Sequence, residues 1–187
     1  MIRVEADRKY WLLGIAAGLA AGILGMLAAL LKVDPWLLFA SYFAAPALFG
    51  AAFGYCLRST AGTNWWRGIC FTLGVVAAHW AAFAMAVRGY DVGYPVSAFA
   101  YGATFALVVT ALAALLYPPA RSARLVAGTV LASGFVALSY LPLQEIVPGG
   151  GILISLTAAW LTFGLVYAVV AALLGRRLFV RGTAAGG

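Results

Sequence analysis

The stretch WWRGICFTLGVVAAHWAAFAMAVR, residues 65–88, decides the fold of this chain. It holds a long apolar run between Arg67 and Arg88, and a helix needs about 20 apolar residues to cross the hydrocarbon core of a bilayer. Near its middle lies His79, the only histidine in the chain and the only ionisable side chain well inside any hydrophobic span. Because an ionisable group that faces lipid is costly, we expect His79 to face the interior of a helix bundle.

The composition of the whole chain supports a membrane protein. Of the 187 residues, 65% are hydrophobic and 9% are charged, and the mean hydropathy is +1.02. A soluble domain carries about 25% charged residues, and it keeps a large part of its chain in contact with water. The sequence therefore predicts an integral membrane protein that forms a single domain over residues 1–187.

Six apolar runs are long enough to cross a membrane. The connections between them are short, and prolines or glycines stand at several of the boundaries. The predicted fold is all-α: one bundle of six transmembrane helices with short tails at 1–9 and 175–187. The helices are expected at about 10–31, 36–57, 65–87, 96–117, 125–143 and 151–174.

Positive charge predicts the orientation of the bundle. If the six helices cross the membrane in turn, Lys32 and Arg88 lie on one side and all other basic residues lie on the opposite side. Lys and Arg are enriched in the cytoplasmic loops of membrane proteins. Both termini are therefore expected in the cytoplasm, beneath a bacterial inner membrane. The net charge of +7 fits anionic lipid headgroups on that side. No basic arm indicates a nucleic-acid partner. The cytoplasmic basic residues are Arg3, Arg8, Lys9, Arg58, Arg67, Arg121, Arg124, Arg176, Arg177 and Arg181.

Small residues mark one face of the first predicted helix. Gly14, Gly18, Gly22 and Gly25 follow spacings of four, four and three, which keep them on one stripe. Small residues let two membrane helices approach closely. The stripe predicts either ordinary packing within the bundle or a docking face for a partner subunit or a second copy of the chain.

Pro46 lies near the middle of the second predicted helix. Proline removes one backbone hydrogen bond and tends to kink a helix. The residue predicts a structural bend, or alternatively a hinge that opens a backbone carbonyl toward a cavity.

Polar side chains line one side of several predicted helices. Thr72 and His79 share a face of the third helix with Gly68. The side chains of such bands either form hydrogen bonds between helices or line one polar pocket around His79. The bands of the later helices are Ser97, Tyr101 and Thr104; Thr129, Ser133 and Tyr140; and Thr157, Trp160, Gly164 and Tyr167.

His79 has four possible roles. It can hold two helices together by a hydrogen bond, contact a ligand at the floor of an outward-facing pocket, or carry a proton, since its pKa in water is about 6.5. The least favoured alternative is ligation of a haem or chlorin, and no cofactor is predicted. Asp91 and Tyr94 follow in the outer loop, and they would lie at the mouth of an outward-facing pocket with His79 at its floor.

Enzymatic motifs are absent from the sequence. No HExxH, GxSxG or Walker motif occurs, and no cluster of metal-ligating residues is present. We therefore predict no catalytic residue and no metal site. An enzyme acting on a lipid or isoprenoid is kept as the third functional class.

The leading hypothesis is a membrane transport or ligand-binding protein. It would be a small carrier, a channel or the substrate-binding subunit of a larger transporter, and its acidic and aromatic outer residues favour a neutral or cationic solute. Six short-looped helices with a glycine stripe resemble the general layout of vitamin-transporter S-components. The alternative is a non-transporting accessory or assembly subunit that docks through the glycine stripe. The residues predicted to bind the ligand are His79, Thr72, Tyr101, Trp160, Asp91 and Tyr94.

Overall fold

The computed structural model describes residues 35–58, 65–117 and 120–138, together with positions 23, 163, 165–167, 169, 170 and 173. Several predictions fall outside these described residues. They are the tails at 1–9 and 175–187, nearly all of the predicted helix 10–31 with its glycine stripe at positions 14, 18, 22 and 25, the segment 139–143, most of the predicted helix 151–174 with the predicted ligand contact Trp160, and the band residues Tyr140, Thr157 and Gly164.

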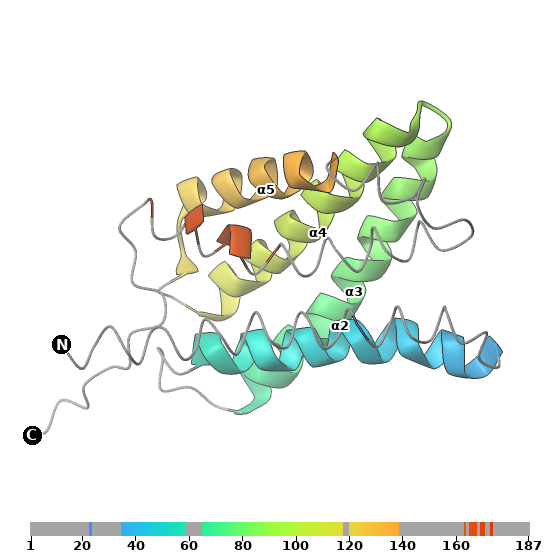
Figure 1. Cartoon of the computed structure of the whole chain (residues 1–187). Helices are drawn as coiled ribbons and strands as arrows, with labels where there is room; N and C mark the ends of the chain where they lie inside the picture. The colour runs from blue at the N-terminus through green and yellow to red at the C-terminus, as the bar shows by residue number, and fades with distance from the viewer. Residues whose placement is uncertain are drawn as a thin grey trace, which may run out of the picture.

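Four helices form the described part of the chain, and no strand occurs among these residues. They are α2 (Pro35–Arg58), α3 (Trp65–Tyr90), α4 (Tyr94–Leu116) and α5 (Ala123–Leu138). Consecutive helices pack against each other, so that α2 and α5 flank the pair formed by α3 and α4 (Figure 1). The prediction of an all-helical chain is confirmed for these residues.

Two of these helices, α3 and α4, are long and apolar enough to cross a membrane, by length and composition. The shorter helix α5, with 16 residues, is apolar as well. Many large apolar side chains point outward; for example, 71% of Leu115 and 63% of Phe135 are exposed. Large outward-facing apolar surfaces mark contact with lipid or with another protein, which is consistent with a membrane protein.

A tight turn joins α3 to α4. The predicted helices end at 87 and begin again at 96, whereas α3 continues to Tyr90 and α4 begins at Tyr94, which leaves three residues between them. Gly93 has a φ of 135° and donates its N–H to the carbonyls of Gly89 and Tyr90. Only glycine adopts such a backbone conformation without strain. The short turn fixes the register in which α4 returns along α3.

The last turn of α3 and the first turn of α4 are in close contact. A Cβ on Gly89 would lie 3.0 Å from the Cα of Ser97. Ser97 is buried, and its hydroxyl donates to the carbonyl of Ala86 over 2.7 Å. The absence of a side chain at Gly89 therefore lets the two helix backbones approach each other next to the turn.

An aromatic cluster forms the centre of the core. Several of its rings meet edge to face, as between Phe53 and Tyr167, whose centroids lie 5.3 Å apart. This arrangement is the one that the charge distribution of aromatic rings favours. Pro46 is also buried, and α2 continues through it. The cluster contains Phe49, Phe53, Phe71, Phe105, Phe163 and Tyr167.

Candidate functional site

His79 is buried between α3 and α4, with 2% of its surface exposed. Its Nδ1 atom is joined to the hydroxyl of Tyr101 by a hydrogen bond of 2.9 Å. The tautomer of the imidazole determines which of the two atoms donates the proton. Tyr101 is itself 3% exposed. His79 therefore faces the bundle, as its place on α3 predicts, and it links two helices through side chains.

Two hydroxyl groups on α5 are buried without a hydrogen-bond partner. They are Thr129 Oγ1 and Ser133 Oγ, and their residues are 0% and 8% exposed. Buried polar groups in proteins are nearly always paired, because an unpaired one loses its bonds to water without replacement. They are one helical turn apart and therefore share one side of α5.

Other threonines of the same chain satisfy their hydroxyl groups locally. Thr72 donates to the carbonyl of Gly68 over 2.8 Å, and Thr110 donates to the carbonyl of Ala106 over 2.6 Å. Each carbonyl belongs to the residue one helical turn earlier, which is the usual solution for a hydroxyl inside an apolar helix. Thr129 and Ser133 depart from this solution.

The unpaired hydroxyls lie on α5, which packs closely against α4 at the residue after Tyr101. A Cβ placed on Gly102 would stand 2.5 Å from the carbonyl oxygen of Ser133, so the two backbones touch at this point. Gly102 directly follows Tyr101 in α4. Ser133 therefore lies at the α4–α5 contact, beside the residue that follows Tyr101. We use the name α3–α4–α5 seam for four buried polar residues: His79, Tyr101, Thr129 and Ser133.

The other predicted ligand contacts are not part of the seam. Thr72 lies seven residues before His79, about 10 Å along the helix axis. Asp91 is exposed in the turn beyond α3, about 18 Å along the axis from His79. Tyr94 is half-buried at the start of α4. The structure therefore unites His79 with Tyr101 and places Thr72, Asp91 and Tyr94 elsewhere.

Trp80 and Gly102 also belong to the site, and neither is among the residues predicted from the sequence. The Trp80 ring lies against His79 with centroids 5.8 Å apart, and against Phe43 of α2 at 5.3 Å. Gly102 has no side chain, and this allows the backbone of α5 to approach α4 closely. A glycine inside an apolar helix is a signal for such close approach, whereas nothing in the pattern marks Trp80.

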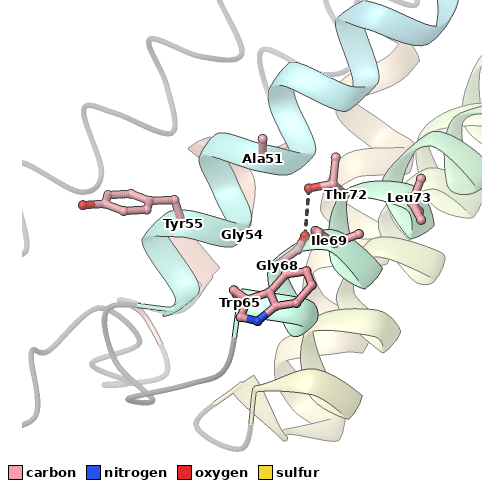
Figure 2. A pocket seen from close by; sticks show the side chains of 8 residues that line it. All are labelled: Ala51, Gly54, Tyr55, Trp65, Gly68, Ile69, Thr72 and Leu73. Carbon is pink, nitrogen blue, oxygen red and sulfur yellow. Dashed lines mark hydrogen bonds between the residues drawn. The ribbon is translucent and has the colours of Figure 1, made fainter.

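A separate cavity of about 400 Å³ lies between α2 and α3, and we call it the α2–α3 groove. Figure 2 shows that the predicted contact Thr72 lies in this groove, where its hydroxyl is bonded to Gly68. The side chains that line the groove are mainly apolar. They include Ala51, Gly54 and Tyr55 of α2, and Trp65, Gly68 and Thr72 of α3.

No group of three or more His, Cys, Asp or Glu side chains gathers in the described part of the chain in a way that would hold a metal ion. No protein-family model matches the chain, and comparisons with curated proteins and with solved structures find no significant match.

Proposed function

We propose that the chain is an integral protein of a bacterial inner membrane, with six helices in one bundle and both termini in the cytoplasm, and that it binds a small solute for transport. The binding site is the α3–α4–α5 seam. The solute is neutral or cationic and carries groups that form hydrogen bonds with hydroxyls.

The unpaired hydroxyls of Thr129 and Ser133 carry this proposal. A buried hydroxyl without a partner costs about 1–3 kcal/mol, and the chain has two of them on one side of α5. Thr110 shows that a local bond is available to a threonine in this bundle. A bound polar solute would supply the missing partners and offset the cost.

The position of the hydroxyls also favours the seam as the site. Ser133 touches the residue next to Tyr101, and Tyr101 is bonded to His79. The imidazole and the phenol are each able to donate and accept hydrogen bonds. Together with two hydroxyls they form a set of uncharged groups, which suits an uncharged hydrogen-bonding solute and does not repel a cation.

A second function is favoured by one observation. His79 is 2% exposed and already bonded to Tyr101, which is also the geometry of a purely structural link between two helices. In that case the protein is an accessory or assembly subunit that transports nothing. A ligand-binding test on the α5 hydroxyls separates the two functions.

The experiment compares Thr129→Val with Thr110→Val in the full chain, purified in detergent. Both residues are almost fully buried, and valine retains the shape of threonine without its hydroxyl. Thermal unfolding is followed with and without a panel of small neutral and cationic polar solutes. We expect a solute that raises the Tm of the wild type and of Thr110→Val, and has no such effect on Thr129→Val or Ser133→Ala.

The unliganded proteins provide an internal check. Without solute, Thr129→Val should be as stable as the wild type or more stable, because it removes an unpaired group, while Thr110→Val should lose stability. If every stabilising solute acts equally on Thr129→Val and the wild type, the seam is not the site. If no solute in the panel stabilises the wild type, the accessory function replaces the transport function.

A further inference from the structure

Side-chain hydrogen bonds join α3 to α4 at three levels. Near the turn the Ser97 hydroxyl donates to the Ala86 carbonyl over 2.7 Å, and in the middle His79 is bonded to Tyr101 over 2.9 Å. At the opposite end Arg67 donates to the carbonyl of the last residue of α4 over 3.3 Å. Because the two helices are joined at both ends and in the middle, we expect the α3–α4 pair to behave as one rigid unit.

The side chains of α5, over its described residues 123–138, provide no such bond to the pair. The polar side chains of this helix are those of Arg124, Thr129 and Ser133. Arg124 is exposed, and the hydroxyls of Thr129 and Ser133 have no hydrogen-bond partner. The side chains of α5 therefore hold it against α4 by packing alone.

The packing of α5 is strongest near the end where the helix begins. Among the buried residues of the described α5, Leu125 is the only large apolar one, and 1% of its surface is exposed. Burial of a leucine stabilises more than burial of an alanine or glycine, because it removes more apolar surface from water. The remaining buried residues are Thr129, Ser133, Gly134 and Ala137, and Val130 and Val136 are partly buried.

Hydrogen bonds also fix the beginning of α5. Arg121, two residues before the helix, donates through Nε to the Ala114 carbonyl of α4 over 3.0 Å. The Ala120 N–H donates to the Tyr117 carbonyl over 2.9 Å, just after α4 ends. The Ser122 hydroxyl accepts a backbone N–H of the first turn over 3.3 Å, as a helix cap does. The beginning of α5 is thus fixed to the end of α4, whereas small residues hold the far end.

We propose that α5 is a gate that pivots at its beginning, around residues 120–125, and gives a solute access to the α3–α4–α5 seam. The unpaired hydroxyls of Thr129 and Ser133 favour this motion, because separation of α5 from α4 ends the burial of both groups. Ala137 lies 12 residues beyond Leu125, about 18 Å farther from the pivot, so opening is widest there. This inference rests on the proposed function for the site and for the orientation, in which the far end of α5 faces outside.

The gate predicts different thiol reactivity at three buried alanines. Each is replaced by cysteine in a full chain whose native cysteines are alanine, and the purified protein reacts with N-ethylmaleimide in detergent without any solute. Ala137→Cys reports on the α4–α5 contact, since a Cβ on Gly102 would stand 2.8 Å from the Ala137 Cβ. Ala120→Cys reports on the pivot and Ala82→Cys on α3; the three alanines are 3%, 2% and 0% exposed. We expect Ala137→Cys to react about tenfold faster than the other two, because local opening exposes it without unfolding the chain.

Removal of the unpaired hydroxyls should keep the gate closed. In the Ala137→Cys chain, Thr129→Val together with Ser133→Ala should slow labelling about fivefold, which corresponds to about 1 kcal/mol in the opening equilibrium. Thr110→Val is the matched control, because its hydroxyl is already paired within α4 and its loss should not slow labelling. Fraying at the end of α5 would not respond to hydroxyls one and two turns away. Circular dichroism verifies that each variant is folded.

Three results would overturn the proposal. Equal labelling of Ala137→Cys and Ala82→Cys would refute the opening, and labelling of Ala120→Cys as fast as Ala137→Cys would refute the pivot. Equal labelling rates after Thr110→Val and after the two α5 substitutions would refute the role of the unpaired hydroxyls. Because no solute is used, these results contradict the gate and not the solute site. If the expected rates are found but no solute raises the Tm, the solute site is wrong and the motion of α5 stands.

Discussion

The bond between His79 and Tyr101 allows a quantitative test. Tyr101→Phe removes one oxygen and keeps the ring, which stacks on Phe105 with centroids 6.2 Å apart. Side-chain hydrogen bonds in membrane proteins contribute about 0.6 kcal/mol on average and about 1.7 kcal/mol at most. Because this bond is 2.9 Å long and both residues are buried, we expect a value in the upper half of that range. Tyr101→Phe should therefore lower the free energy of unfolding by about 1–1.7 kcal/mol.

A double-mutant cycle with His79→Leu isolates the pair. Unfolding is titrated with sodium dodecyl sulfate in mixed micelles and followed by far-ultraviolet circular dichroism. The expected coupling energy of about 1 kcal/mol corresponds to about a fivefold change in the unfolding equilibrium constant. Tyr117→Phe is the matched control, since that buried hydroxyl donates to the Gly54 carbonyl over a longer 3.4 Å, and its loss should cost less.

The same variants also distinguish a helix link from a binding residue. The effects of mutations at independent sites add to within about 0.3 kcal/mol. A coupling energy below this value would therefore refute the idea that the pair holds α3 to α4. If Tyr101→Phe retains its stability but loses the solute-induced Tm shift, Tyr101 contacts the solute. If it loses stability and keeps the shift, the pair is structural.

Two further predictions concern packing and orientation. Gly102→Ala should destabilise the protein by about 1–3 kcal/mol, because the added Cβ would stand 2.5 Å from the Ser133 carbonyl oxygen. Gly68→Ala should be neutral or stabilising, because its Cβ would meet no atom within 4 Å. Equal Tm values for the two variants would contradict the close contact at Gly102. In a chain whose native cysteines are replaced by alanine, Asp91→Cys should react with a membrane-impermeant maleimide on intact cells, and Arg121→Cys only after permeabilisation. Both positions are exposed, so labelling of both from the same side would refute the predicted topology.

Helical periodicity made the burial of His79 predictable. A residue on the small and partly polar side of α3 faces neighbouring helices, and the structure places His79 there with 2% of its surface exposed. The bands on α4 and α5 were likewise visible in the sequence, and Tyr101, Thr129 and Ser133 are all buried. The six spans and the cytoplasmic termini remain predictions based on the apolar runs and on the distribution of arginine.

The partner of each polar residue was not predictable. Thr72 and His79 share one side of α3, yet Thr72 lies beside α2 in the groove, whereas His79 bonds to α4. The reason is that α2 and α4 both run along α3: α4 contacts it from Arg67 to Gly89, and α2 contacts it at Thr72 and again at Trp80. Periodicity tells which side of a helix is covered, and it does not tell which of the covering helices a given side chain meets.

The sequence by itself determined that the described chain is helical and apolar, and which side of α3, α4 and α5 carries the buried polar residues, because these properties follow from local composition and the 3.6-residue period. Only the tertiary structure decided that His79 meets Tyr101, that Ser133 meets Gly102, and that Thr129 keeps an unpaired hydroxyl. Such pairings depend on the closeness of helix backbones, which is set by the packing of residues that lie far apart in the chain, such as Gly102 and Ser133.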